Sequence, residues 1–408
     1  MKTIRTKKAI FLSATLIIIF CLIAAPAMAA KKPIKIGVIG MATGMGYLTW
    51  KPFYDGLVMT VDEINANGGI LGRPVKLVVR DDELKVDLAI RGLKDLILRE
   101  RVDFLLQCSS SGIGLAETEV VKQYKIPIIY CAANTQRLTE DKGHRYAFLI
   151  QPNTRIEASA IAIFTKKNGW KKIWTVMPDY EWGHTVQKFY IEKLKNLVPD
   201  AEIVGESWPK IGETDMTPYI SAIMAAKPDF VMGGLWGADL INFTKQAKPY
   251  GYFDKVVSSG VYDLNQLRAL GNEMVEGAVS WNRGEFFSVN TPAMADFVKK
   301  FQEAYDGEYP TAYANFAHES LYAIKKAMEI AGTTDKEKVT DAMTGLSFSG
   351  PRGELQFRAC DNQANAPEYV GFTVKDPKYP FYVLRDVLVV KAEDAWLSCD
   401  EISKARGN

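Results

Sequence analysis

The feature that most constrains the fold is an alternation of short β-branched runs with amphipathic helical stretches, which occurs twice along the chain. Such alternation is typical of a parallel sheet covered by helices on both faces. Because the module is repeated, the sequence predicts an α/β protein with two similar lobes that face each other across a cleft. Corresponding runs are offset by about 126 to 139 residues, beginning near Ile34, Val75, Asp103 and Ile126 and again near Ile173, Ala201, Asp229 and Val256.

A third section, from about Gly277, does not repeat the module. It contains two expected helices, over residues 291–304 and 313–330, followed by two expected strands over residues 369–374 and 383–390. Since these helices come after the second module, we expect the chain to cross back to the first lobe and then return through a multi-strand hinge. The expected division is a leader over residues 1–29, a first lobe of 30–151 plus about 283–350, and a second lobe of 152–282 plus about 351–408.

The first 29 residues have the pattern of a secretion signal. Basic side chains precede an apolar stretch over residues 9–25, and Ala27-Met28-Ala29 forms a small-x-small cleavage motif. An uncleaved membrane anchor is the alternative, which the short apolar stretch and the cleavage motif disfavour. Cys21 follows Phe20 rather than a small residue, which disfavours a lipid attachment site. We therefore expect export to the periplasm, with cleavage near Ala29.

The charge balance excludes two classes of partner. The chain carries 50 basic and 48 acidic residues, and four of the basic residues lie in the leader. The exported part therefore has no basic surplus with which to bind nucleic acid or an anionic membrane. Beyond the leader, no apolar run approaches the length of a membrane span. These properties predict a soluble, globular protein.

Four cysteines follow the leader, an even number in an oxidising compartment. Cys360 and Cys399 enclose a C-terminal segment of 38 residues, and we expect them to form a disulfide. Cys108 and Cys131 follow two neighbouring strands, so they either lie near one another at a sheet edge or are buried free thiols. The absence of a Cys-x-x-Cys motif argues against a redox or zinc site.

Candidate ligand-binding residues follow the strands, because ligands of open α/β sheets bind beyond the carboxyl ends of the strands. The turn over residues 107–112 contains three serines and precedes a helix that begins near Ile113. Serines and free backbone N–H groups at the positive end of a helix dipole suit a carboxylate, and simple helix capping without a ligand is the alternative. The next strand ends in a second small, polar turn. From these two turns we select Gln107, Ser109, Ser110, Ala132, Ala133 and Asn134.

Corresponding positions in the second half carry indoles rather than small polar groups. Trp182 lies in the turn after one strand and Trp236 in the turn after another. One wall of the cleft can therefore fix a charged group while the other covers an apolar or aromatic body. Ordinary packing within the lobe is the alternative for each tryptophan. Tyr47, in the glycine loop after the first strand, and Tyr262, after the fourth strand of the second half, complete the candidate site.

Enzymatic interpretations find little support in the sequence. The glycines after the first strand imitate a dinucleotide-binding loop, but the run Gly44-Met45-Gly46-Tyr47-Leu48-Thr49 lacks the third glycine. None of the three histidines has a second ligand at metal-binding spacing. Ser109 has no Gly-x-Ser-x-Gly setting, so a hydrolase is unsupported. We expect no enzymatic activity, no cofactor and no metal.

Segments along the whole exported chain resemble the leucine/isoleucine/valine-binding proteins, the type I periplasmic solute-binding proteins of ABC importers. The stretch Ile64-Asn65-x-x-Gly68-Gly69-Ile70 is specific to this resemblance. The resemblance implies two lobes, joined by three crossings, that close on a ligand. The other matching segments are Ile36-Gly37-Val38 with its glycine loop, residues 62–72, Arg80-Asp81-Asp82, residues 108–111 and residues 131–134.

The resemblance also implies roles for single residues. The ligand carboxylate would be held by Ser109 and, at the next turn, by Ala132 and Asn134. Asn134 stands where the family usually has threonine, which keeps a polar contact. Aromatic cover from the second lobe would come from Trp182 and Trp236, and two indoles suggest a flat or larger ligand body.

One departure from the family bears on the ligand. Family members that bind amino acids have an acidic residue after the fourth strand of the second lobe, where this chain has no acid until Asp263. An ammonium group without a partner in a closed cleft is costly. A standard α-amino acid is therefore disfavoured unless Asp263 or Glu181 reaches the ligand.

The sequence thus predicts a periplasmic solute-binding protein that captures a small carboxylate by lobe closure and delivers it to an ABC permease in the inner membrane. The ligand is expected to be an aromatic or aliphatic acid, or else a branched-chain or other hydrophobic amino acid. The alternative is a ligand-sensing receptor domain with the same clamp and no transport role. We expect a monomer without nucleic-acid partners.

Overall fold

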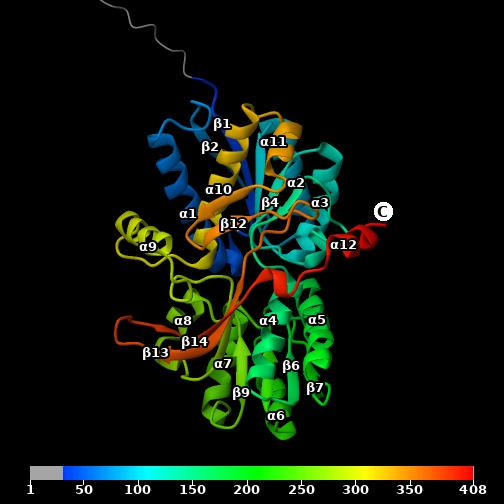
Figure 1. The fold of residues 1–408 in the computed structure, drawn as a ribbon. Coiled ribbons are helices and arrows are strands. Elements are labelled where there is room, and N and C mark those ends of the chain that lie inside the picture. Colours follow the sequence, from blue (N-terminus) through cyan, green and yellow to red (C-terminus); the bar gives the residue numbers. More distant parts are fainter. Residues whose placement is uncertain (1–30, 408) are drawn as a thin grey trace, which may run out of the picture.

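The computed structural model describes residues 31–407, which form two lobes, one above the other in Figure 1. The expected leader, residues 1–29, lies outside the described residues. The predicted α/β architecture with two helix-covered sheets is confirmed. Among the described helices, none has an apolar stretch long enough to traverse a bilayer.

The first lobe is built on a parallel sheet with the strand order β2-β1-β3-β4-β5. Ile36 and Val38 pack in one core with α1 and α10, whereas Ile39 packs on the opposite face with α2 and α3. Because both faces are buried, the central strands β1, β3 and β4 are mostly apolar, whereas the edge strand β2 also carries charged residues. The strands are β1 (Ile34–Gly40), β2 (Val75–Asp81), β3 (Phe104–Cys108), β4 (Ile128–Tyr130) and β5 (Ala147–Leu149). The helices are α1 (Tyr47–Ala66), α2 (Val86–Asp95), α3 (Ser111–Tyr124), α9 (Pro292–Ala304), α10 (Ala312–Ala331) and α11 (Lys336–Met343).

The family-specific motif around Asn65 closes the turn between α1 and β2. The Asn65 Nδ2 donates to the Val75 carbonyl at 3.0 Å, and its Oδ1 accepts from the Val75 N–H at 2.7 Å. Gly69 has φ +75°, and a Cβ there would lie 1.9 Å from the Arg73 carbonyl oxygen. Only glycine fits such a position without moving the backbone. The motif therefore fixes where β2 joins the sheet.

The second lobe contains a mixed sheet with the order β14-β13-β10-β9-β8-β6-β7, in which β13 is antiparallel to β10 and β14. Trp281 and Val370 pack with α4 and α5, whereas Val231 packs with α6, α7 and α8 on the other face. The strands are β6 (Lys172–Val176), β7 (Glu202–Ser207), β8 (Phe230–Gly233), β9 (Val257–Gly260), β10 (Val279–Asn282), β13 (Glu368–Lys375) and β14 (Tyr382–Val390). The helices are α4 (Thr154–Lys167), α5 (Glu181–Leu197), α6 (Thr217–Ala226), α7 (Gly237–Ala247) and α8 (Leu264–Leu270).

A buried arginine joins the crossings between the lobes. The Arg352 Nη2 donates to the carbonyl of Ile150 at 2.8 Å, in the first crossing, and its Nη1 donates to the carbonyl of Arg283 at 3.4 Å, in the second. Its charge is paired with Glu319 of α10 at 2.6 Å, and both side chains are fully buried. Arg352 therefore holds two crossings and a helix of the first lobe together at the hinge.

The C-terminal segment crosses between the lobes once more. Val390, at the end of β14, packs in a core of the second lobe, whereas Cys399 forms a disulfide with Cys360. The helix that follows, α12 (Cys399–Ala405), lies beside the first lobe (Figure 1), where Arg406 donates to the carbonyls of Thr139 and Glu140. The other two cysteines of the described chain, Cys108 and Cys131, are buried and free.

These contacts change the expected lobe boundary. The sequence-based division placed residues 351–408 in the second lobe, but the hairpin of β11 (Ser347–Gly350) and β12 (Gly353–Gln356) spans that boundary. Its strand pairing keeps the two sides together, and Phe357 and Ala366 pack in the core of the first lobe. We therefore propose that residues 283–366 and 399–407 belong to the first lobe and 367–390 to the second.

Candidate functional site

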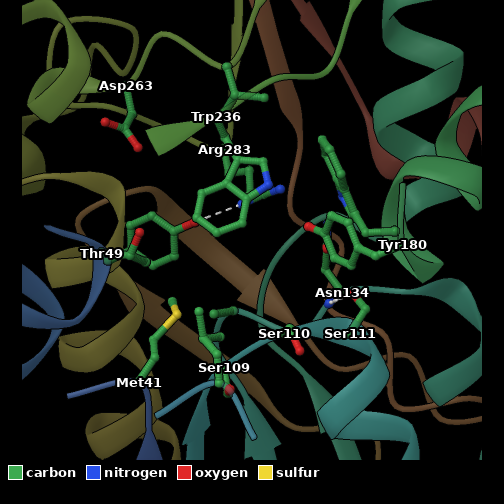
Figure 2. A pocket seen from close by; sticks show the side chains of 15 residues that line it. Met41, Thr49, Ser109, Ser110, Ser111, Asn134, Tyr180, Trp236, Asp263 and Arg283 are labelled. Carbon is green, nitrogen blue, oxygen red and sulfur yellow. Dashed lines mark hydrogen bonds between the residues drawn. The ribbon is translucent and has the colours of Figure 1, made fainter. Parts of the chain in front are cut away.

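A pocket of about 520 Å³ lies between the lobes and is the candidate site (Figure 2). Its wall combines residues that follow strands β1, β3 and β4 of the first lobe with residues that follow β6, β8, β9 and β10 of the second. The site thus lies beyond the carboxyl ends of both parallel sheets. It is lined by Met41, Thr49, Leu84, Ser109, Ser110, Ser111, Ala132, Asn134, Tyr180, Trp182, Trp236, Val261, Asp263, Arg283 and Tyr313.

The serine turn, residues 109–111, forms part of the wall of this pocket. Ser110 caps α3 by accepting from the N–H of Ile113 at 3.4 Å, and the Ser111 hydroxyl accepts from the N–H of Asn134 at 3.3 Å. The Ser109 hydroxyl is buried beside the Asp82 carboxyl group, to which it can donate a hydrogen bond. A ligand carboxylate at this turn would compete with Asp82 for the Ser109 hydroxyl.

The second turn of the first lobe, which follows β4, contributes mainly to the shape of the pocket. Ala132 and Asn134 line the pocket, but the Asn134 amide Nδ2 already donates to the carbonyl of Pro152 at 3.1 Å. That bond ties the turn to the first crossing between the lobes. The Asn134 side chain is therefore a positioning group as well as part of the wall, which the sequence did not indicate.

Three aromatic side chains of the second lobe, Tyr180, Trp182 and Trp236, form the opposite part of the wall. Trp182 stacks on Trp281 with a centroid distance of 5.5 Å and an interplanar angle of 9°. Its indole N–H donates to the buried Glu157 carboxylate at 2.9 Å. Trp182 is therefore held rigidly in the core and turns part of its surface to the pocket.

Arg283, which the sequence analysis does not include, is the cation of the pocket wall. It follows β10 directly, and its Nε donates to Glu157 Oε1 at 2.5 Å while its Nη1 donates to the Tyr313 hydroxyl at 2.9 Å. Figure 2 shows this second bond as a dashed line across the pocket wall. The one sequence signal that could have identified Arg283 is its position as a basic residue directly after a strand. The sequence did not predict that strand, β10.

Asp263 lines the pocket, but its carboxylate also caps a helix. Its Oδ1 accepts from the N–H groups of Asn265 and Gln266 and caps α8. Burial raises the pKa of Asp263 to about 6. Glu181, the other acid considered from the sequence, does not line the pocket and instead accepts from Thr135 at 3.2 Å. Of the two candidate partners for a ligand ammonium, the structure places only Asp263 in the wall.

Four residues selected from the sequence lie outside the pocket. Tyr47 begins α1 and is 47% exposed, because it points to solvent from the first helical turn. Gln107 and Ala133 are buried beneath the turns, where the Gln107 Oε1 accepts from the Ala133 N–H at 3.3 Å. Tyr262 is buried in the second lobe with its hydroxyl 3.0 Å from Thr244 Oγ1. We do not retain these four residues in the site.

The lobes touch at both sides of the pocket. The Thr135 hydroxyl of the first lobe donates to Glu181 of the second, and the Asn265 Nδ2 of the second lobe donates to the carbonyl of Leu48 of the first at 2.5 Å. The structure therefore represents a closed arrangement of the clamp. Within residues 31–407, no group of three or more His, Cys, Asp or Glu side chains is arranged to hold a metal ion.

Known proteins resemble this chain over most of its length. Residues 33–376 match the family model described as periplasmic binding protein. The Leu/Ile/Val-binding protein homolog 4 of Brucella melitensis is 26% identical over 369 residues, which cover 85% of this chain and 86% of the relative. This similarity confirms the resemblance to the Leu/Ile/Val-binding proteins.

Solved structures share the fold. The solute binding protein of an ABC transporter from Rhodopseudomonas palustris, in complex with 3,4-dihydroxy benzoic acid, has a TM-score of 0.80 at 21% identity and covers 88% of this chain and 98% of its own. A leucine binding protein from Thermotoga maritima has a TM-score of 0.78 at 20% identity and covers 88% and 99%. At such identities the likeness concerns the fold alone. Together with the family match, it shows that this chain belongs to the periplasmic binding protein family.

Proposed function

We propose that this protein is the solute-binding component of an ABC-type importer and captures a small carboxylate by closure of its lobes. The observation that carries the proposal is the serine turn at the start of α3, whose residues 109–111 line the pocket between the lobes. The backbone N–H groups of the first helical turn lie beside it and have no intrahelical partner. Such a helix N-terminus attracts a carboxylate through its dipole and its free donors.

The remaining wall indicates the body of the ligand. Trp182, Trp236 and Tyr180 offer aromatic faces, and Met41, Leu84 and Val261 add apolar surface. A flat or apolar body of modest size suits a pocket with such a wall. Aromatic and aliphatic acids meet this description. Two related structures bear on the size of the ligand body. One is a complex with 3,4-dihydroxy benzoic acid, and another is named a leucine binding protein.

A hydrophobic amino acid is the neighbouring ligand class. Its ammonium would need Asp263, which among residues 31–407 is the only carboxylate that lines the pocket. Because Asp263 already caps α8 and its pKa is raised to about 6, it is a weaker partner than a free carboxylate. Arg283 in the same wall is already paired with Glu157, so this pair offers no free carboxylate to an ammonium. These charges favour acids over amino acids.

The mechanism is capture by a shift of population. The ligand touches both lobes only when they are closed, so its binding free energy favours the closed form. No bond is made or broken. The closed form then docks, as a monomer, on a permease in the inner membrane. We further propose that the leader is cleaved near Ala29 and that residues 30–408 act in the periplasm.

Thermal shift of purified residues 30–408 against aromatic acids, aliphatic acids, amino acids and amides tests the ligand class, because a tight ligand raises the melting temperature. For the best acid, we expect Ser109→Ala to weaken binding roughly tenfold, since a charged acceptor loses one donor. Ser403→Ala, at an exposed position of α12, is the matched control and should bind as the wild type does. Unchanged affinity in Ser109→Ala, measured by calorimetry, would contradict the serine-turn assignment.

A further inference from the structure

The guanidinium of Arg283 has one nitrogen free for a ligand. Its Nε and Nη1 are used by Glu157 and Tyr313, whereas its Nη2 has no hydrogen-bond partner within residues 31–407. The side chain is only 11% exposed, and it lines the pocket between the lobes. The remaining donor is therefore available inside the closed clamp and largely shielded from bulk water.

Two neighbours fix the direction of this donor. Glu157 is fully buried and is itself held by the indole N–H of Trp182 at 2.9 Å, so the guanidinium cannot rotate without breaking a buried ion pair. Tyr313 accepts from Arg283 Nη1, which leaves the proton of its own hydroxyl for another acceptor. Burial raises the pKa of Tyr313, so this hydroxyl stays protonated. Arg283 and Tyr313 together offer two preorganised donors.

These donors lie across the pocket from the serine turn. Figure 2 shows Ser109, Ser110 and Ser111 on one side of the pocket and Arg283 on the other. The serine turn belongs to the first lobe, whereas Arg283 lies in the crossing that follows β10 and is paired with Glu157 of the second lobe. A ligand that contacts both ends links the first lobe to a hinge residue that is anchored to α4 of the second lobe. It must therefore carry a hydrogen-bond acceptor at each end of its body.

The charges of the wall decide which kind of acceptor fits the Arg283 end. Glu157 already neutralises Arg283, and Asp263 adds a carboxyl group to the same pocket. A second carboxylate on the ligand would enter without a compensating positive charge, which is costly in a closed site. A neutral oxygen accepts the same hydrogen bonds without that cost.

We propose that Arg283 and Tyr313 determine specificity by recognising a neutral oxygen, a hydroxyl or a carbonyl, at the end of the ligand remote from its carboxylate. This inference rests on the proposed function, in which the carboxylate lies at the serine turn. It narrows the ligand class from small apolar acids to acids with an oxygen substituent at the far end of the body, such as ring-hydroxylated aromatic acids or ω-hydroxy aliphatic acids.

Calorimetry with matched acids tests the inference. The aromatic pair is 4-hydroxybenzoate and 4-methylbenzoate, and the aliphatic pair is 5-hydroxypentanoate and hexanoate. The members of each pair have similar size and differ in the terminal oxygen. We expect the wild type to bind the oxygen-bearing member of at least one pair tenfold more tightly or better. Terephthalate, which carries a second carboxylate, is expected to bind more weakly than 4-hydroxybenzoate.

Two variants locate the preference at Arg283 and Tyr313. Tyr313→Phe keeps the buried Arg283–Glu157 pair, and we expect it to reduce the preference for the oxygen to less than threefold while affinity for the other member stays within twofold. The double variant Arg283→Met, Glu157→Gln removes the guanidinium without leaving a buried charge and should abolish the preference. Tyr124→Phe, at the far end of α3, is the matched control and should keep it.

The outcomes separate this inference from the proposed function. If no carboxylate in the panel binds, the proposed function fails and the inference fails with it. If carboxylates bind but neither pair shows a preference for oxygen, or terephthalate binds more tightly than 4-hydroxybenzoate, only the inference is overturned. A preference that survives in Tyr313→Phe and in the double variant also overturns it.

Discussion

The Glu181 carboxylate of the second lobe accepts a hydrogen bond from the Thr135 hydroxyl of the first lobe at 3.2 Å. Arg137 Nη1 of the first lobe lies 3.6 Å from the same carboxylate. Neither Thr135 nor Glu181 lines the pocket. The contact therefore acts on the equilibrium between open and closed lobes rather than on the ligand.

Glu181→Gln should weaken ligand binding about two- to tenfold, because the closed form loses roughly 1 kcal/mol of stabilisation. Calorimetry with the best ligand measures the change, and the urea unfolding midpoint should stay close to that of the wild type. Glu192→Gln, at an exposed position of the same helix α5, is the control. Equal affinity in the wild type and Glu181→Gln would show that this contact does not affect closure.

Asp82 should make stability depend on pH. Burial raises the pKa of Asp82 to about 6, above its unfolded value near 4, so the folded state holds the proton more tightly. The free energy of unfolding therefore falls as pH rises from 4 through 6, by about 1–3 kcal/mol for this group. Asp82→Asn removes that contribution.

The measurement is urea unfolding of the wild type and Asp82→Asn at pH 4.5 and pH 7.5. The stability of the variant relative to the wild type should increase at the higher pH. His144 and His318, whose pKa burial lowers to about 4, titrate in both proteins and cancel in the difference. A difference that is independent of pH would contradict the raised pKa.

The disulfide between Cys360 and Cys399 should stabilise the chain by about 4 kcal/mol, according to the loop-entropy model for its sequence separation of 39 residues. Cys360→Ser with Cys399→Ser should lower the urea unfolding midpoint accordingly. A reducing agent should lower the stability of the wild type and leave the variant unchanged. If both proteins respond equally to reduction, the disulfide is not the source of the effect.

The buried pair of Arg352 and Glu319 should show strong coupling. Arg352→Met leaves the Glu319 charge without its partner and should cost about 3–5 kcal/mol of stability. Arg352→Met combined with Glu319→Leu removes both charges and should be less destabilising than Arg352→Met alone. Urea unfolding of the two single variants and the double variant gives the coupling energy. Additive losses would show that the two side chains act independently.

Part of the site could be predicted because topology determines it. Residues that follow parallel strands meet at one edge of a sheet, and this rule alone brings Ser109, Asn134, Trp182 and Trp236 to the pocket. The repeated β-α pattern likewise predicts most strands and both lobes. Strands β5 and β10 were not expected, because no long amphipathic helix precedes them: a three-residue 3-10 turn comes before β5, and the seven-residue helix α8 comes before β10.

The rest of the site depends on contacts between distant parts of the chain. Arg283 is directed into the pocket wall by Glu157, 126 residues away, and by Tyr313 of α10. No local pattern specifies such a meeting. Tyr262 illustrates the opposite case, since it follows a strand as predicted but its side chain turns into the core beside Thr244. Position along the chain predicts the turn, whereas side-chain direction depends on tertiary packing.

The C-terminal segment limits how far the two lobes can separate. Residues 391–398 connect β14 of the second lobe to the cysteine that is bonded to the first lobe. Fully extended, the nine residue steps from Val390 to Cys399 span at most about 32 Å. The distance between Val390 and Cys399 therefore cannot exceed that value in any open form, however weak the contacts between the lobes become. An oxidising environment thus restricts the range of motion of the lobes, and reduction of the Cys360–Cys399 bond would release it.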